Sequence, residues 1–245
     1  MKQWFLIAMV ILFTHLASAQ DKYVPEEGSV EQKEKTKKEK KKKEKVFKID
    51  MSLPMVLIIG DSISMGYTGN VRKLLAGKAN VIHNPGNSQG TTHTLAKVDQ
   101  WLATQKWDVI HFNLGLHDLK RVKVVGTSKN SNDPADPFQA DLTTYASNLE
   151  KITRKLKTTG AKLIFATTTP FPAGVRPYRD PADADRYNQA ALKIMKKNDI
   201  PVNDLYALVL PEIKTLQKPQ NVHFQKEGSA KMAKQVVARI EKALK

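Results

Sequence analysis

The sequence predicts an α/β fold, a three-layer sandwich in which helices cover both faces of a five-stranded parallel sheet. Short, continuous apolar runs alternate with amphipathic stretches along residues 49–245, which is the pattern of doubly buried strands connected by helices. This stretch has the length of one ordinary domain. The chain of 245 residues contains no cysteine, so a large apolar core must stabilise the domain without disulfides.

Five apolar runs are predicted to be the strands: Val56–Ile59, Ala79–His83, Val109–Asn113, Lys162–Thr167 and Ile200–Asn203. Helical patterns fall between and after them, near Val71–Ala76, Thr92–Thr104, Phe138–Thr158, Ala184–Lys197 and Ser229–Leu244. In the third of these, apolar residues recur at spacings of three and four between residues 142 and 156, which marks one buried stripe of a helix. Asp141 and Gly160 suit the start and the end of that helix.

The first 48 residues differ in composition from the rest of the chain. Residues 1–19 have the pattern of a secretory signal peptide, because Lys2 is followed by an apolar stretch and then by Ala17-Ser18-Ala19. A retained amphipathic anchor is the alternative. Residues 20–48 are expected to be a disordered charged linker, since residues 31–45 contain nine Lys, four Glu and no apolar side chain. We therefore expect a secreted or periplasmic protein that is not an integral membrane protein.

The formal net charge of +16 is not confined to the linker. Residues 49–245 contain 28 Lys or Arg and 17 Asp or Glu, an excess of +11. A basic domain attracts anionic partners, and the basic linker could bind an anionic glycan or surface, although a solvated spacer is the more ordinary role. No helix-turn-helix, zinc-finger or aromatic-basic pattern is present, so we expect no nucleic-acid partner.

Polar and glycine-rich residues follow four of the predicted strands. Ligands bind at the carboxyl ends of the strands in sheets of this type. Two long connections, residues 120–137 and 171–183, would overhang the same edge, and connections of this length are often functional lids. The residues at the strand ends are Gly60-Asp61-Ser62, Asn84-Pro85-Gly86, Asn113-Leu114-Gly115 and Thr167-Thr168-Thr169-Pro170.

Ser62 and His223 are the candidate nucleophile and general base. Ser62 lies where the first strand turns into a helix, and His223 lies in a loop-like segment before the last helix. A serine hydroxyl needs a base to take its proton, and histidine suits neutral pH. The alternatives are a helix-capping serine and a surface histidine. The Gly-x-Ser-x-Gly elbow of the α/β-hydrolases is absent.

The chain resembles the SGNH hydrolases, also called GDSL esterases, through four segments: Gly60-Asp61-Ser62-Ile63, Asn84-Pro85-Gly86-Asn87-Ser88-Gln89-Gly90-Thr91, Gly115-Leu116-His117-Asp118 and Val222-His223-Phe224. The resemblance covers nearly all of residues 55–245, and it is greatest to secreted bacterial members such as carbohydrate O-acetylesterases. It implies a flavodoxin-like fold and hydrolysis of esters by Ser62 and His223. It also implies an oxyanion hole made by the N–H groups of Ser62 and Gly90, with Gly86 as the alternative to Gly90.

Two residues depart from the family pattern. The third segment normally carries an Asn that completes the oxyanion hole, and this chain has His117 there; its ring N–H could donate in the same way, or the residue could be structural. The family usually places Asp three residues before the catalytic His, and this chain has Gln220 there, followed by Asn221. A neutral amide can orient the imidazole, and Asp204 or Glu227 could instead approach from elsewhere in the fold.

The sequence therefore predicts an exported serine esterase that removes ester groups, in particular O-acetyl groups, from carbohydrate. No metal-ligand spacing is present, so we expect no metal and no cofactor. Candidate substrate-binding residues are Asn113, Arg176 and Arg179, the two arginines suiting an acidic or sulfated sugar. The alternatives are a lipid or thioester hydrolase of the same family and an inactive relative that binds glycan or the cell envelope.

Overall fold

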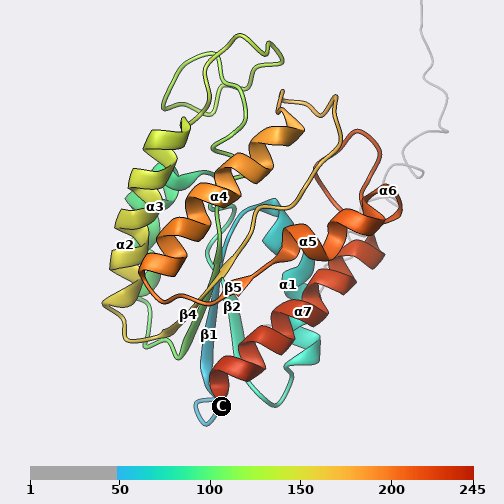
Figure 1. Cartoon of the computed structure of the whole chain (residues 1–245). Coiled ribbons are helices and arrows are strands. Elements are labelled where there is room, and N and C mark those ends of the chain that lie inside the picture. Colours follow the sequence, from blue (N-terminus) through green and yellow to red (C-terminus); the bar gives the residue numbers. More distant parts are fainter. Residues whose placement is uncertain (1–48) are drawn as a thin grey trace, which may run out of the picture. The chain divides into compact units, whose positions relative to one another are not determined.

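The computed structural model describes residues 49–245, so the predicted signal peptide (1–19) and charged linker (20–48) lie outside the described residues. Five parallel strands form one sheet in the order β2-β1-β3-β4-β5 (Figure 1). They are β1 (Met55–Ile59), β2 (Asn80–His83), β3 (Val109–Asn113), β4 (Lys162–Ala166) and β5 (Val202–Asn203). The predicted α/β fold with a five-stranded parallel sheet is confirmed.

Helices cover both faces of the sheet. On one face α1 (Ser62–Leu74) packs against α7 (Lys226–Leu244), and on the other α3 (Leu142–Lys157) packs against both α2 (Thr91–Leu102) and α4 (Pro181–Lys197) (Figure 1). Both β1 and β3 are buried along their whole length, as strands between two helical layers should be. The shorter elements α5 (Leu205–Val209), η1 (Leu210–Glu212) and α6 (Ile213–Leu216) precede the last helix.

The helix α1 begins nine residues earlier than the pattern near Val71–Ala76 predicts, at Ser62. Its first half contains glycine, serine and threonine, which are weak helix formers, so helical periodicity is hard to recognise there. Tertiary burial compensates, since Tyr67 and Val71 are fully buried against the sheet. The Asp61 side chain caps the helix by accepting a hydrogen bond from the N–H of Ile63 at 2.9 Å.

The long connection that follows β3 and the one that follows β4 are tied to each other by backbone hydrogen bonds. The N–H of Arg121 donates to the carbonyl of Tyr178 at 3.0 Å, the N–H of Tyr178 donates to Ser131 at 2.9 Å, and the N–H of Ser131 donates back to Arg121 at 2.9 Å. The closed circuit satisfies backbone groups that would otherwise need water. These connections therefore form a continuous rim above the carboxyl edge of the sheet (Figure 1).

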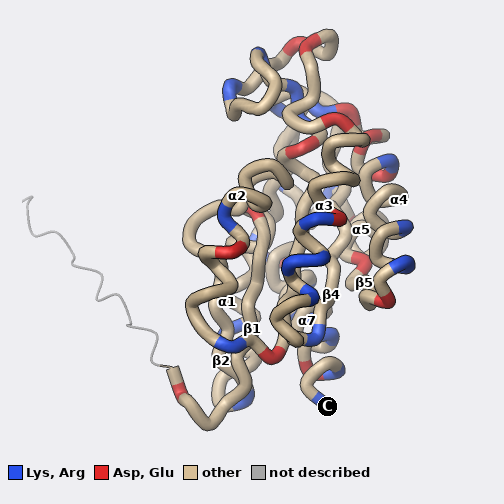
Figure 2. The backbone as a smooth tube through the Cα atoms, turned by 90° about the vertical axis from the view of Figure 1, so that its left-hand side faces the viewer, with Lys and Arg blue, Asp and Glu red and all other residues tan. Residues whose placement is uncertain are grey.

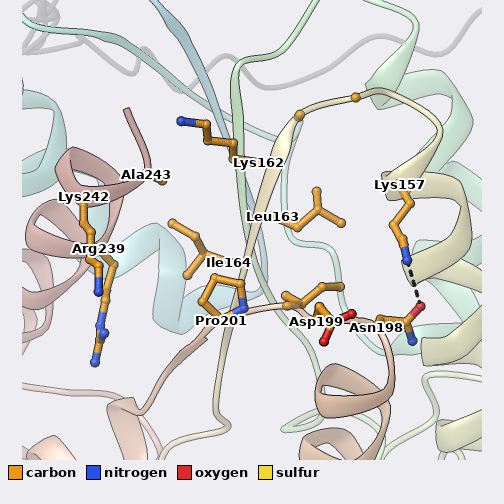
Figure 3. A pocket seen from close by; sticks show the side chains of 13 residues that line it. Lys157, Lys162, Leu163, Ile164, Asn198, Asp199, Pro201, Arg239, Lys242 and Ala243 are labelled. Carbon is orange, nitrogen blue, oxygen red and sulfur yellow. Dashed lines mark hydrogen bonds between the residues drawn. The ribbon is translucent and has the colours of Figure 1, made fainter. Parts of the chain in front are cut away.

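A cavity of about 620 Å³ lies at the opposite, amino edge, beside the starts of β4 and β5 (Figure 3). Its floor is apolar and its rim carries Lys157, Lys162, Arg239 and Lys242. The helices α3, α4 and α7 all end here, and cations near helix C-termini are stabilised by the helix dipoles. Lys157 and Lys242 lie in the last turns of α3 and α7, where this effect applies, and the cavity is separated from Ser62 by the length of the sheet. Basic residues are in any case spread over several helices of the domain (Figure 2).

Candidate active site

The fold brings Ser62 and His223 together, although 161 positions separate them in the chain. Ser62 is the first residue of α1, directly above β1, and its Oγ lies 2.8 Å from Nε2 of His223. The loop that carries the histidine is held by its own backbone: the N–H of Lys218 donates to the carbonyl of His223 at 2.9 Å. The Gln217 side chain donates to the carbonyl of Val222 at 3.0 Å. The distance between the serine and the histidine suits proton transfer.

Asn221 orients the ring of His223. Its Oδ1 accepts a hydrogen bond from the backbone N–H of His223 at 2.9 Å and lies 2.7 Å from the ring Nδ1. An amide oxygen can only accept, so Nδ1 carries the hydrogen and Nε2 presents a lone pair to the hydroxyl of Ser62. A neutral amide thus selects the tautomer that a general base needs.

Gln220, at the position where the family usually has Asp, does not contact the ring. It is exposed, has a left-handed backbone with φ 48° and forms no hydrogen bond to His223. Asp204 is also elsewhere, because its Oδ1 accepts hydrogen bonds from Thr167 and from the N–H of Ala207. Within residues 49–245, no carboxylate is hydrogen-bonded to His223, and Asn221 is the group that orients it.

The charges that act on His223 favour its neutral form. Partial burial lowers the pKa of His223, and the cations Lys218 and Arg179 lower it further. A neutral imidazole is the form that accepts a proton from Ser62. We therefore expect activity to persist below pH 6.5, the ordinary value for histidine, and to fall only as the pH drops through the lowered pKa.

We predict that Asn221→Asp moves the acidic limb of the pH–rate profile to higher pH. A carboxylate beside Nδ1 favours the imidazolium and raises the pKa of His223 by about 1 unit, so activity is lost sooner as the pH falls. The pH dependence of kcat/KM for a small acetate ester measures the shift. Gln220→Asp is the matched control, because that side chain does not reach the ring; equal shifts in both variants would contradict the assignment of Asn221.

Two backbone N–H groups are available for an oxyanion. Those of Ser62 and Gly90 form no hydrogen bond within residues 49–245, and each stands at the start of a helix, where the dipole favours negative charge. Gly90 also has a packing reason to be glycine, since an added Cβ would lie 3.0 Å from Oδ1 of Asp118. Gly86, the predicted alternative, has φ +67° and open space around its Cα, which indicates a role in the turn.

His117 lies near the Ser62–His223 pair, since the charge of His223 acts on it. Its Nδ1 is buried and has no hydrogen-bond partner among the described residues, so Nε2 is the atom that can reach a ligand. Burial lowers the pKa of His117 to about 3, and nearby cations, first among them Lys120, contribute. The ring is therefore neutral at any working pH, and it can donate to an oxyanion only as the Nε2–H tautomer.

Asp118 joins the third segment to the start of α2. Its Oδ1 accepts hydrogen bonds from the N–H of Thr91 at 2.8 Å and from the Thr91 hydroxyl at 2.5 Å. Burial raises the pKa of Asp118 to about 7, against the opposing effect of the Thr91 hydrogen bonds. Thr91 follows Gly90 in the chain, and Asp118 follows His117. The contact between Thr91 and Asp118 therefore holds the backbone next to both of these candidate oxyanion donors.

The three candidate substrate-binding residues differ in placement. Asn113 is buried, and its amide donates to the carbonyls of Ala166 and Thr167 at 2.9 and 3.0 Å. Arg179 is also buried: its Nε donates to the carbonyl of Leu116 at 2.9 Å and Nη1 to that of Pro177 at 3.1 Å. Arg176 is exposed. Asn113 and Arg179 thus hold the rim of the site together, and contact with substrate stays a prediction for all three.

The remaining histidines of the domain have local partners or lie apart. Nε2 of the buried His111 lies 3.0 Å from the Asn203 amide, and His83 contacts a serine beneath the site. Within residues 49–245, no group of three or more His, Cys, Asp or Glu side chains is arranged to hold a metal ion. Lys120 and Lys218, whose charges act on the site, belong to no recognised motif, so residue patterns alone do not reveal them.

Solved structures of similar fold include a lipase/acylhydrolase from Enterococcus faecalis, with 20% identity, a TM-score of 0.64 and coverage of 78% of this chain and 96% of that chain. A GDSL-like lipase from Bacteroides thetaiotaomicron is 19% identical, with a TM-score of 0.61 and coverage of 77% and 88%. A catalytic mutant of an acetylxylan esterase from Geobacillus stearothermophilus is 18% identical, with a TM-score of 0.62 and coverage of 76% and 94%. At these identities the likeness concerns the fold.

No curated protein matches the chain. The family model of the GDSL-like lipase/acylhydrolases matches residues 58–231, which is most of the described domain and includes Ser62, Gly90, His117 and His223. The resemblance expected from the four short segments is thereby confirmed, and the chain belongs to the GDSL-like lipase/acylhydrolase family of ester-hydrolysing enzymes.

Proposed function

We propose that this protein is an exported serine esterase that removes O-acetyl groups from carbohydrate. The observation that carries the esterase mechanism is the 2.8 Å contact between Ser62 Oγ and His223 Nε2, with the ring tautomer set by Asn221. Similarity of fold to acetylxylan esterases supports an acetylated sugar as substrate. Export rests on the composition of residues 1–19, outside the described residues.

In the acylation step, Ser62 Oγ attacks the acetyl carbonyl carbon while its proton moves to Nε2 of His223. The tetrahedral intermediate collapses when the carbon–oxygen bond to the sugar breaks, and His223 gives the proton to the departing sugar oxygen, which leaves as a hydroxyl. Water then attacks the acetyl-enzyme, again giving its proton to His223. Breakdown of the second intermediate releases acetate and restores the Ser62 hydroxyl.

The negative oxygen of each intermediate is held by the N–H groups of Ser62 and Gly90 and by Nε2–H of His117. These donors are in place before the substrate arrives, so no reorganisation is needed when charge develops. Because Asn221 is neutral, the imidazolium formed in each step lacks the stabilisation that a carboxylate would give. The backbone donors and His117 therefore carry a larger share of the charge stabilisation.

The charged groups around the Ser62–His223 pair favour an acidic sugar substrate. Lys218 and Arg179 are the charges that act on His223, and Lys120 and Arg179 both act on His117. Of these cations Lys218 is exposed and can meet a ligand, whereas Arg179 and Lys120 are buried, as are the carboxyls Asp61 and Asp118 that act on them. An ester on a sugar chain that carries carboxylate or sulfate groups would enter a positive potential, which raises its association rate.

Acetate release from matched oligosaccharides tests the proposal. We expect turnover of acetylated oligosaccharides, with kcat/KM about tenfold higher for a uronic-acid chain than for a neutral chain, and convergence of the two in high salt. Lys218→Gln should reduce this preference, whereas Lys242→Gln, at the opposite edge of the sheet, should not. Hydrolysis of long-chain lipid esters or thioesters without release of sugar acetate would contradict the substrate.

An inactive glycan-binding relative is the second candidate, favoured by the replacements at His117 and Gln220. A serine-directed phosphonate separates the two, because it labels only a serine that a base activates. Labelling of Ser62 together with turnover of a small acetate ester supports the enzyme.

No helix within residues 49–245 is long and apolar enough to span a bilayer.

A further inference from the structure

A second serine–histidine contact lies directly beneath the nucleophile. Ser64, one of the most buried polar residues at 0% exposure, has its Oγ 2.7 Å from Nε2 of His83. The same Oγ donates to the backbone carbonyl of Asp61 at 2.7 Å. On the far side of the ring, Nδ1 of His83 lies 2.7 Å from the carbonyl of Asn84. The Asn84 carbonyl, the His83 ring, the Ser64 hydroxyl and the Asp61 carbonyl thus lie in one row of hydrogen-bond contacts.

This row of contacts ends at the peptide unit between Asp61 and Ser62, whose N–H is a candidate oxyanion donor. The carbonyl of Asp61 and the N–H of Ser62 belong to the same peptide group, and that N–H is one of the two free backbone donors of the site. A hydrogen bond accepted by a peptide carbonyl polarises the unit and makes its N–H a stronger donor. The hydroxyl of Ser64 therefore acts on the oxyanion hole without touching the substrate.

Packing at Gly60 shows that the position of the Ser64 hydroxyl is built into the fold. A Cβ added to Gly60 would lie 2.6 Å from Oγ of Ser64, which no real side chain would tolerate. The absence of a side chain at Gly60 leaves room for the Ser64 hydroxyl against the backbone. The N–H of Gly60 donates to Oδ1 of Asn84 at 2.9 Å. This bond joins the turn at Gly60 and Asp61 to Asn84, so the two ends of the row of hydrogen-bond contacts are held to each other.

The number of available hydrogens decides which hydrogen bonds of His83 and Ser64 can form together. Both ends of the chain are carbonyl oxygens, which only accept, so Nδ1–H of His83 points to Asn84. A hydrogen on Nε2 as well would make the ring an imidazolium, which would donate to Oγ and leave the Ser64 hydroxyl to Asp61 alone; burial lowers the pKa of His83 and disfavours this form. In the neutral ring, Nε2 is a lone pair that competes with the Asp61 carbonyl for the single hydrogen of Ser64. A hydrogen-bond donor at the position of Nε2 would thus direct the Ser64 hydroxyl to the Asp61 carbonyl.

We infer that Ser64 is a positioning residue of the esterase, which strengthens the Ser62 N–H in the oxyanion hole under the control of His83. The inference rests on the proposed acyl-enzyme mechanism but not on the sugar substrate. One oxyanion donor is worth about 10²–10³ in rate, and each hydrogen bond strengthens its neighbour by about 10–30%. Together these values give an expected loss of roughly 2- to 8-fold in kcat when the Ser64 hydroxyl is removed.

Three variants test the inference, with a small chromogenic acetate as substrate. Ser64→Ala should lower kcat with KM little changed, and should weaken binding of a boronic-acid transition-state analogue by the same factor. His83→Gln, whose amide donates where Nε2 lies, should keep or raise kcat. Thr68→Val is the matched control: it removes a buried hydroxyl one turn later on α1, which donates to the carbonyl of Ser64 at 2.7 Å and not to that of Asp61.

The amide proton of Ser62 provides a readout that does not need turnover. Its NMR resonance should move upfield in Ser64→Ala and stay in place in Thr68→Val, because a weaker hydrogen bond at the carbonyl withdraws less electron density from the N–H. A normal kcat and an unmoved resonance in Ser64→Ala would overturn the inference. If the wild-type chain lacked esterase activity, the proposed function would fail while the resonance shift would still report on the hydrogen-bond chain.

Discussion

Ser62→Ala is expected to reduce kcat for ester hydrolysis by about 10⁶-fold, the loss seen when the nucleophile of a serine hydrolase is removed. In the proposed mechanism Ser62 forms the covalent bond to the acyl group, and no other hydroxyl lies at hydrogen-bond distance from the ring of His223 in the described part of the chain. Hydrolysis of a small chromogenic acetate measures the loss, and a serine-directed phosphonate should no longer label the protein.

The fold should survive this change, since the Ser62 side chain stabilises no buried group. Its backbone remains the first residue of α1, and the helix is capped by Asp61. Ser52→Ala, at an exposed serine that bonds only to Asp50, is the control and should retain full activity. Turnover in Ser62→Ala within tenfold of the wild-type rate would mean that the contact with His223 is structural.

His117→Ala should lower kcat by about 10²–10³-fold, the usual effect of losing one oxyanion donor. In the proposed mechanism two backbone N–H groups hold the oxyanion, and His117 is the third donor, at the position where the family pattern has Asn. KM for a small ester should change little, because the interaction forms mainly in the transition state. Steady-state kinetics on an acetate ester separates the two parameters.

His117→Asn is the informative companion variant. An amide N–H₂ at this position donates without depending on a tautomer, so we expect kcat to equal or exceed that of the wild type. Because the pKa of His117 is lowered to about 3, its protonation should leave no limb in the pH–rate profile near neutrality. An alanine variant with kcat within threefold of wild type would show that two donors suffice and that His117 is structural.

The frame of the molecule is readable in the sequence because burial on two faces leaves a strong pattern. Val109–Asn113 is predicted with the bounds that the structure shows, and Asp141 caps α3 by accepting a hydrogen bond from the N–H of Thr144 at 2.7 Å. The strand ends carry the residues of the site because the parallel topology collects them at one edge. Ser62 and His223 follow from residue type combined with this topology.

Contacts that depend on loop conformation are not readable in the same way. Whether Gln220 or Asn221 orients His223 depends on the left-handed backbone at residue 220, which no local pattern specifies for a glutamine. The burial of Arg179 and its hydrogen bonds to two carbonyls depend on the circuit between two connections that are far apart in the chain. The contact between Ser64 and His83 joins a helix to an edge strand, and neither residue belongs to a recognised motif.

The hydrogen-bonded circuit of Arg121, Ser131 and Tyr178 bears on how a polymer would reach the catalytic serine. A rim that is held together by its own backbone hydrogen bonds does not have to close before the reaction, unlike the lid of an enzyme whose turnover is limited by lid closure. Ester groups in the middle of a polysaccharide could then reach Ser62 without a free polymer end having to enter the site first. Such an enzyme would remove acyl groups from intact polymers as readily as from short fragments.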